Sequence, residues 1–389
     1  MTDAGFDKLS DSALFLSDEH RALRDQLRRF VNAEIKPHAL AWEEAGATPR
    51  ALLRQMGALG FLGIRYPEEL GGSGLDELAS VLLAEELGRS TFAGVAITVL
   101  VHTDMASVHI VNAGTEAQKR AWIPRVCTGE AIVAVAVTEP GAGSDVKGIR
   151  TTARRQGDHY VLNGAKTFIT NGVLADVYCV AARTGGGGGS SGVTMFLVEK
   201  GTPGFTVSRA LDKHGWRSSD TAELSFADCA VPVENVLGAE GRGFYEIMKN
   251  FQNERLVLGA MAMGESQAAL AMTLDYVRQR AAFGATLWDK QAVRQRLAML
   301  AARVEAARAL IYATAHRLGQ GEELVREVSM IKALCGELVN EVMYACVQFH
   351  GGMGFMRESA IERMSRDARV QAIGGGATEV MLEEVAKRL

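Results

Sequence analysis

Residues 135–145, VAVTEPGAGSD, combine residue types that could bind a polar ligand. An apolar run rich in β-branched residues ends in a Thr-Glu pair, and the Pro-Gly-Ala-Gly sequence that follows forces a turn whose backbone can approach a ligand closely. Ser144 and Asp145 then add a hydroxyl and a carboxylate, so the loop offers N–H donors, a side-chain donor and an acceptor. The pattern predicts a strand that feeds a ligand loop, although turns of this composition also occur without any ligand.

Glu254 has a sequence position suited to a general base. Ile247, Phe251, Glu254 and Leu258 follow one another at spacings of four, three and four residues, which places the carboxylate on an apolar stripe of a helix. Burial there would disfavour the charged form and raise the pKa, which suits proton abstraction near neutral pH. Spacing alone leaves the alternative open that Glu254 pairs with a basic neighbour or reaches solvent.

Two helical regions flank the centre of the chain. Residues 1–131 show helical periodicity and capping signals, such as Thr115 with Gln118 three residues later. Residues 239–389 are helical again, with lengths and connections suited to a four-helix bundle. The four helices predicted there cover residues 241–284, 289–318, 321–350 and 357–387.

The central region, residues 132–238, has a different pattern. Short runs rich in β-branched and aromatic residues alternate with Gly, Asn, Asp and Pro turns, which predicts an antiparallel barrel or sandwich. Asn163-Gly164 predicts a two-residue hairpin turn, because both central positions of a type I′ turn need positive φ. No GxGxxG sequence opens a helix after a strand, so the pattern argues against a Rossmann arrangement.

Composition excludes several classes of function. The 389 residues are 48% apolar and 23% charged, which is ordinary for a soluble globular chain. A net charge of −4 gives no basic surface for nucleic acid, and we find no stretch of about 20 apolar residues for a membrane span. The first 20 residues lack the pattern of a targeting segment, and five scattered cysteines without a CxxC pair predict neither zinc site nor disulfides. We therefore expect a cytoplasmic protein.

The chain resembles the acyl-CoA dehydrogenase family over nearly its whole length. Several long motifs occur in the family's order, and they stand at residues 135–145, 164–172, 213–238, 276–284, 348–355 and 365–380. The resemblance implies an α+β multidomain fold with an N-terminal helical domain at 1–131, a middle antiparallel β-barrel at 132–238 and a C-terminal four-helix bundle at 239–389. It further implies FAD at the domain junction, a homotetramer, and α,β-dehydrogenation of an acyl-CoA thioester with an electron-transferring flavoprotein as acceptor.

The reaction requires a base for the α-proton, and the resemblance indicates where that base lies. In much of the family it is a glutamate in the last motif, where this chain has Gly375. Another branch, which includes the long-chain and isovaleryl-CoA dehydrogenases, has glycine or alanine there and a glutamate before an arginine on the first bundle helix. Glu254-Arg255 matches that pair. The resemblance therefore assigns the base to Glu254, and Gly375 could serve through its backbone N–H in polarising the thioester oxygen.

The resemblance also assigns binding residues position by position. Ser144 and Arg255 match residues near the CoA portion of the substrate. Phe168 stands where relatives often have a tryptophan beside the flavin, and Thr170 matches a hydrogen-bond donor to the flavin. Arg280, Phe283 and Gln291 match residues that hold the FAD pyrophosphate and adenosine across a subunit interface. The remaining residues implied in cofactor binding are Val135, Val137, Thr138, Ser144, Gln348, Gly351, Gly352, Thr378 and Glu379. Of these, Thr378 is displaced by one residue, because the family's flavin-contacting threonine corresponds to Ala377 here.

Other functions fit the same motifs. A non-catalytic flavin- or acyl-CoA-binding scaffold subunit would keep the architecture, and an oxidase would differ only in reacting with oxygen. The last motif looks most like the long-chain branch, so we expect a medium or long straight-chain substrate in fatty-acid β-oxidation, with a branched-chain substrate as the alternative. The spacing of residues does not define the depth of the acyl pocket.

Overall fold

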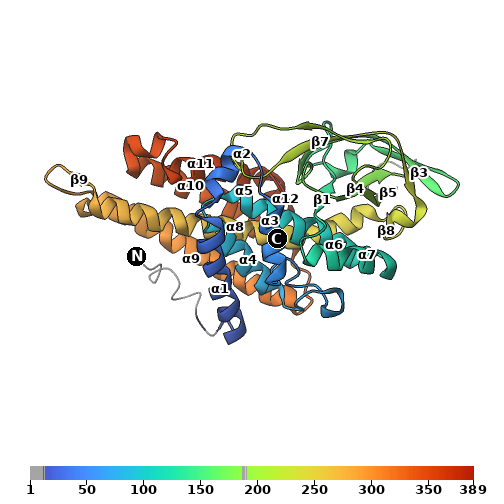
Figure 1. The fold of residues 1–389 in the computed structure, drawn as a ribbon. Coiled ribbons are helices and arrows are strands. Elements are labelled where there is room, and N and C mark those ends of the chain that lie inside the picture. The colour runs from blue at the N-terminus through green and yellow to red at the C-terminus, as the bar shows by residue number, and fades with distance from the viewer. Residues whose placement is uncertain (1–11, 13, 186–188, 190) are drawn as a thin grey trace.

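The computed structural model describes residues 12, 14–185, 189 and 191–389. Helices from both ends of the chain pack together, and the sheet lies at one end of the long helices (Figure 1). Residues 1–11, on which much of the expectation about a targeting segment rests, lie outside the described residues.

The N-terminal region is helical, as predicted. Asp76 caps one helix by accepting a hydrogen bond from the Ala79 N–H at 3.0 Å, and the predicted Thr115-Gln118 capping box is present. The helices are α1 (Asp18–Phe30), α2 (Ala39–Ala45), α3 (Arg50–Ala58), α4 (Glu77–Gly88), α5 (Ala93–Leu100), α6 (Ser107–Ala113) and α7 (Glu116–Cys127).

The segment Ala93–Ala113 is almost entirely internal. It consists of α5, a π-helical turn at Val101–Ala106, and α6. Its length and composition would allow it to cross a membrane, so the sequence reading that nothing approaches such a span was wrong. However, 94% of its most apolar window is buried inside the protein, which is typical of a core helix of a folded domain. The only such helix among the described residues is this one.

The middle region forms one mixed sheet, whose strands pair in the order β6-β7-β3-β2-β4-β5-β8, with β1 added beside β4. The expectation of a purely antiparallel sheet was wrong, because β1 runs parallel to β4, from Val133 opposite Val177 to Ala136 opposite Val180. Strand pairing among the described residues leaves β6 and β8 as edges, so a closed barrel is not confirmed. The strands are β1 (Val133–Ala136), β2 (Thr152–Gln156), β3 (His159–Thr170), β4 (Val177–Arg183), β5 (Val193–Glu199), β6 (Phe205–Ala210), β7 (Thr221–Pro232) and β8 (Val236–Leu237).

The predicted hairpin at Asn163-Gly164 was wrong. Both residues lie inside β3, where the register against β7 shifts at a bulge. A Cβ at Gly164 would collide with Thr151, so this glycine allows a close approach of two strands. The turn between β2 and β3 consists of Gly157 and Asp158, because Gln156 pairs with His159.

The C-terminal region contains three long helices and a broken fourth. They are α8 (Gly243–Gln279), α9 (Gln291–Gly319), α10 (Val325–His350), α11 (Ala360–Ala368) and α12 (Thr378–Ala386), and a small hairpin of β9 (Ala281–Ala282) and β10 (Ala285–Thr286) joins α8 to α9. The fourth helix was predicted as continuous over 357–387, but the chain leaves it at residues 373–377. The break coincides with Gly375 and Gly376, whose φ angles of +66° and +111° are not helical.

A buried ion pair joins the two helical regions. Arg308 on α9 donates to Glu85 on α4 at 2.6 Å, and the Tyr312 hydroxyl donates to the same carboxylate at 2.7 Å. Arg308 and Glu85 are each 1% exposed, so the charges compensate one another in the core. This contact fixes α4 against the bundle, directly beside α8, which carries Glu254.

Candidate active site

The loop that follows β1 is held to β3 by buried polar contacts. Lys166 on β3 donates to the Val137 carbonyl at 3.0 Å and to the Glu139 carboxylate at 2.8 Å, and the Thr167 N–H donates to the Thr138 carbonyl at 3.0 Å. Burial, partly opposed by the charge of Glu139, lowers the pKa of Lys166 to about 8. The structure therefore brings the predicted residues at 135–138 beside those at 168–170.

Phe168 is presented outward from this junction. It lies at a second register shift of β3, has a left-handed φ of +58°, and leaves 69% of its surface exposed. A bulky residue in that conformation is strained, and such strain is typical of ligand-binding segments. Thr170, two residues later, is half-buried. An exposed aromatic ring beside an N–H-rich loop fits the binding of a planar ring system.

Open space surrounds the predicted ligand loop. A Cβ at Gly141 or Gly143 would meet nothing within 4 Å, and Ser144 and Asp145 are exposed. The Asn171 side-chain oxygen, just beyond Thr170, is buried without a hydrogen-bond partner. A loop whose backbone is open to a ligand, with a buried polar atom nearby that has no partner, fits a polar cofactor bound at this junction.

Glu254 lies on the buried stripe that its spacing predicted. Ile247, Leu258 and Glu254 are buried, and Phe251 is half-buried. The Asn250 carboxamide donates to Glu254 Oε1 at 2.9 Å. Burial raises the pKa of Glu254 to about 7, against the opposing effects of Asn250 and Arg255. The alternative that Glu254 reaches solvent was wrong, since it is only 8% exposed.

The Arg255 guanidinium contacts Ser329 on α10. It donates to the Ser329 hydroxyl at 3.3 Å and lies 5.3 Å from the centre of the Phe251 ring. Burial lowers the pKa of Arg255. The alternative that Glu254 forms a direct ion pair with its basic neighbour was wrong, because no such pair occurs among the described ion pairs.

Gly375 faces the same stripe of α8 as Glu254. A Cβ added there would overlap with Leu258 Cδ1, and Leu258 lies one helical turn after Glu254. Lys332 on α10 holds this loop by donating to the carbonyls of Gln371 at 2.6 Å and Gly376 at 3.1 Å. Thr378 and Glu379 open α12 directly after the loop, with Thr378 buried and Glu379 exposed.

The remaining predicted cofactor residues lie at the other end of the bundle. Arg280, Phe283 and Gln291 belong to the β9–β10 hairpin and its flanks, which project from the body on the side opposite the sheet (Figure 1). Tyr276 stacks on His350 with ring centroids 4.3 Å apart, which places the end of α10, with Gln348, Gly351 and Gly352, at this same end of the bundle. Arg280 is about 40 Å along the helix axis from Glu254, at about 1.5 Å per residue. The structure thus divides the predicted cofactor residues into two groups.

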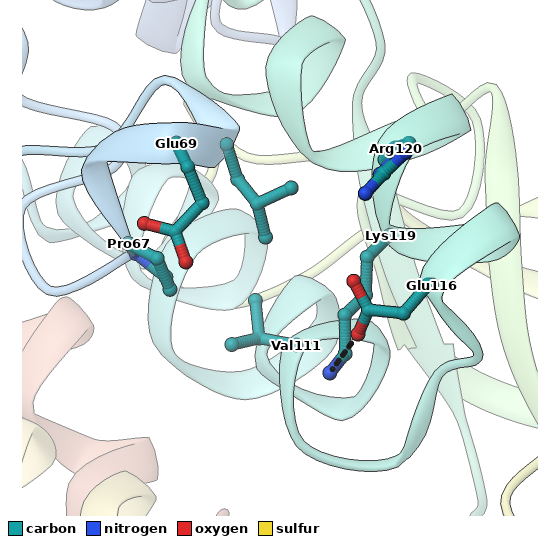
Figure 2. A pocket seen from close by; sticks show the side chains of 7 residues that line it. Pro67, Glu69, Val111, Glu116, Lys119 and Arg120 are labelled. Carbon is teal, nitrogen blue, oxygen red and sulfur yellow. Dashed lines mark hydrogen bonds and ion pairs between the residues drawn. The ribbon is translucent and has the colours of Figure 1, made fainter.

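A separate surface hollow is unconnected with these residues. It has a volume of about 270 Å³ and lies against α6 and α7 (Figure 2). Its charged side chains are of both signs, and Lys119 pairs with Glu116 at 3.2 Å. The lining consists of Pro67, Glu69, Leu70, Val111, Glu116, Lys119 and Arg120, so we do not assign the active site to this hollow.

Comparison with known proteins accounts for all three regions of the chain. Residues 17–130 match the acyl-CoA dehydrogenase N-terminal domain, residues 134–229 the middle domain, and residues 241–389 the C-terminal domain. The chain belongs to the acyl-CoA dehydrogenase family. It is therefore an oxidoreductase with FAD as cofactor, and its helical, sheet and helical regions correspond to the three domains of that family.

Individual acyl-CoA dehydrogenases are similar over nearly their whole length. The long-chain specific acyl-CoA dehydrogenase of Sus scrofa is 40% identical over 387 residues, covering 98% of this chain and 89% of that protein. The isovaleryl-CoA dehydrogenase of Pongo abelii is 38% identical, covering 96% and 89%. A solved glutaryl-CoA dehydrogenase of Mycobacterium smegmatis in complex with FADH2 has a TM-score of 0.92 at 28% identity, covering 98% of this chain and 97% of that one.

Two site residues of this acyl-CoA dehydrogenase were missed from the sequence. Asn250 contacts Glu254, and its position four residues before the glutamate on the same helix was a signal that could have identified it. Lys332 gave no such signal, because its two carbonyl acceptors are about 40 residues away in sequence and meet it only through the packing of α10 against the loop at 371–376.

Proposed function

We propose that Glu254 is the base that removes the α-proton of an acyl-CoA thioester, in a dehydrogenation that yields a trans-2-enoyl-CoA. The observation that carries this proposal is a buried carboxylate whose pKa is raised to about 7, one helical turn before Leu258, which packs against Gly375. A base with a pKa near the working pH is both available in its charged form and strong enough to accept the proton.

In this reaction the protein accepts the α-proton and the cofactor accepts the β-hydride. The α C–H bond breaks and its proton moves to a Glu254 carboxylate oxygen, while its electrons form the new double bond. FAD, when bound, supplies the acceptor for the hydride that leaves the β-carbon. Phe168, Thr170 and the loop at 135–144 are the residues of this chain that would hold the flavin ring.

Gly375 contributes its backbone in this proposal. As negative charge develops on the thioester oxygen, an N–H aimed at that oxygen stabilises it. The left-handed conformation of Gly375 and the anchoring of its loop by Lys332 support a fixed N–H direction. A side chain there would meet Leu258, so a glycine lets the loop approach α8 closely.

The division of the predicted cofactor residues supports an oligomer. The β9–β10 hairpin and the end of α10 lie at the end of the bundle away from the sheet that carries Phe168 (Figure 1), so in this proposal a second copy brings Arg280 and Gln348 to the same FAD. The hairpin residue Phe283 is 96% exposed and Phe355, after α10, is 85% exposed, as expected for apolar side chains that pack against another subunit. We propose a homotetramer, in which Arg280, Phe283, Gln291, Gln348, Gly351 and Gly352 complete the FAD site of a neighbouring subunit.

A medium or long straight-chain acyl-CoA is the proposed substrate, and an electron-transferring flavoprotein the proposed acceptor. The similarity to the long-chain specific relative supports the chain length, and the similarity to isovaleryl-CoA dehydrogenase supports a branched substrate as second candidate. Turnover of straight C4 to C18, isovaleryl and cyclic acyl-CoAs would distinguish them. Peroxide formation without an added acceptor would instead identify an oxidase.

The base is tested by anaerobic addition of acyl-CoA to the FAD-loaded enzyme. The flavin absorbance of the wild type should bleach, whereas Glu254→Gln should keep bound FAD and lose bleaching by at least about a thousandfold in rate. Glu265→Gln is a matched control, because Glu265 is also a buried glutamate of α8 with a raised pKa but bonds Gln371 instead. Bleaching by Glu254→Gln at the wild-type rate would overturn the assignment, and a wild type that binds acyl-CoA without bleaching would indicate a scaffold subunit.

A further inference from the structure

The π-helical turn at Val101–Ala106 presents its backbone to α8 next to Glu254. In a π-helical turn the hydrogen bonds run to the fifth residue, and such turns are frequent at functional sites. Two asparagines of α8 reach this turn. Asn250 donates to the carbonyls of Met105 at 3.2 Å and Asp104 at 3.4 Å, and Asn253 donates to the Asp104 carbonyl at 2.9 Å.

Asn250 and Asn253 each donate to a carboxylate, but to different ones. Asn250 Nδ2 donates to Glu254 Oε1 at 2.9 Å, whereas Asn253 Nδ2 donates to Asp104 Oδ1 at 3.3 Å and has no bond to Glu254 among the described hydrogen bonds. An amide nitrogen has two hydrogens in a fixed plane. When one is directed at the π-turn carbonyls, the other is directed at the carboxylate, so the backbone of the 93–113 segment determines where the carboxylate lies.

We propose that Asn250 is a positioning residue that holds the Glu254 carboxylate in its reactive orientation and charge state by linking it to the π-turn. The inference rests on the proposed function of Glu254 as base. Asn250 is 3% exposed, so water does not compete strongly for its hydrogen bonds, and a hydrogen bond to a buried charged group is among the stronger ones.

The other charged groups near Glu254 cannot replace this hydrogen bond. Arg255 on the same helix is directed to Ser329, and Lys332 on α10 is engaged with two carbonyls. On the π-turn, the Asp104 carboxylate accepts from Thr103 at 2.6 Å and lies 3.8 Å from the Arg65 guanidinium. The Asn250 hydrogen bond is therefore the direct contact that favours the charged form of Glu254, against burial, which disfavours it.

The test compares Asn250→Leu with Asn253→Leu in the FAD-loaded enzyme. Both variants remove a carboxamide that binds the π-turn, but only the first removes a donor to Glu254. The rate of anaerobic flavin reduction by acyl-CoA is measured from pH 5 to 10. For Asn250→Leu we expect the acidic limb to move up by about one pH unit, with about a fivefold lower rate near pH 7 that recovers at high pH, because losing the donor raises the pKa of Glu254.

A second readout follows Glu254 without turnover. The carboxyl stretching band that disappears in Glu254→Gln is titrated by infrared difference spectroscopy, and its midpoint should rise in Asn250→Leu and stay at the wild-type value in Asn253→Leu. If Asn250→Leu does not fold, Asn250→Ser shortens the side chain with less loss of polarity and should show a shift in the same direction.

Two results would overturn the inference. One is an acidic limb and a carboxyl midpoint in both Asn250 variants that coincide with those of the wild type. The other is an equal shift in Asn253→Leu, which would attribute the effect to packing of the π-turn. If Glu254→Gln loses flavin reduction and either of these results is found, Glu254 remains the base and only the positioning role of Asn250 is rejected.

Discussion

Leu258 occupies the space into which a side chain at Gly375 would project, since a Cβ at that position would overlap with Leu258 Cδ1. Glu254 lies one helical turn before Leu258, so the chain has a carboxylate on α8 and no room for one on the loop. The two possible sources of a base, α8 and the loop at 373–377, thus exclude one another at this contact.

Gly375→Ala should therefore be destabilising in two separable ways. The left-handed φ of +66° costs a residue with a Cβ about 1 to 2 kcal/mol, and the clash with Leu258 adds to it. The free energy of unfolding should fall by about 2 to 3 kcal/mol in denaturant titrations. In a double-mutant cycle, Leu258→Ala should remove the part of this loss that comes from the clash and leave the part that comes from the backbone. A coupling energy of zero between the two substitutions would show that the two residues are not in contact.

Gly375→Glu should crowd the same space and alter chain-length preference. The added side chain would have to pass Leu258 to reach solvent or the stripe that carries Glu254. We expect kcat/KM to fall more for the acyl chains that fill the pocket most fully, measured over a ladder of straight-chain acyl-CoAs. Unchanged kinetics along the whole ladder would refute the placement of Gly375 at the substrate.

Phe168 should lower the stability of the FAD-free protein and strengthen FAD binding. Its left-handed backbone is strained and its ring is 69% exposed, so Phe168→Gly should stabilise the FAD-free protein by about 1 kcal/mol. Phe168→Ala loses the ring but keeps the strained Cβ, so its stability should match the wild type. Both variants should weaken FAD binding in fluorescence titrations, and equal stabilities for the Gly and Ala variants would exclude backbone strain.

Glu265 should make the stability of the protein depend on pH. Burial and the nearby charge of Asp367 raise its pKa from 4.5 to about 8, so between these values the folded protein holds a proton that the unfolded chain releases. The stability it contributes is complete below about pH 4.5 and is lost as pH rises through 8. Glu265→Gln keeps a side-chain oxygen that accepts from Gln371, but it has no titrating carboxyl group and should not lose stability as the pH rises.

The expected difference between wild type and Glu265→Gln is therefore largest in alkali. The two proteins should unfold with similar free energies near pH 5, and the variant should be more stable by on the order of 5 kcal/mol near pH 9. Urea titrations at the two pH values measure this. Parallel pH profiles for the two proteins would mean that Glu265 titrates normally.

The sequence could predict features that depend on neighbours along the chain. The stripe of α8 that buries Glu254 and the capping box at Thr115 follow from helical spacing, and both are present. Features that depend on contacts between segments far apart in the sequence could not be predicted from it. Gly164 sits in a bulge because Thr151 of a neighbouring segment comes close, and local turn chemistry alone gave the wrong answer there. The contact of Asn250 with the π-turn likewise requires α8 to pack on the 93–113 segment.

Lys332 should determine how firmly the loop that carries Gly375 is held. Lys332 is 2% exposed, and its ammonium group donates to the Gln371 and Gly376 carbonyls, one on each side of Gly375. Lys332→Met would leave both buried carbonyls without this donor, at about 1 to 3 kcal/mol each, offset by no longer burying a cation. The net loss of stability should be about 2 kcal/mol, and KM for acyl-CoA should rise as the loop loosens.

Ser329→Ala provides the control for this change. Ser329 lies one turn earlier on the same face of α10 and contacts Arg255, with no bond to the 371–376 loop among the described contacts. Its removal should cost less than about 1 kcal/mol and leave the loop in place. If Lys332→Met unfolds at the wild-type denaturant concentration and keeps the wild-type KM, the loop must be held by its own conformation and by the bond from Gln371 to Glu265.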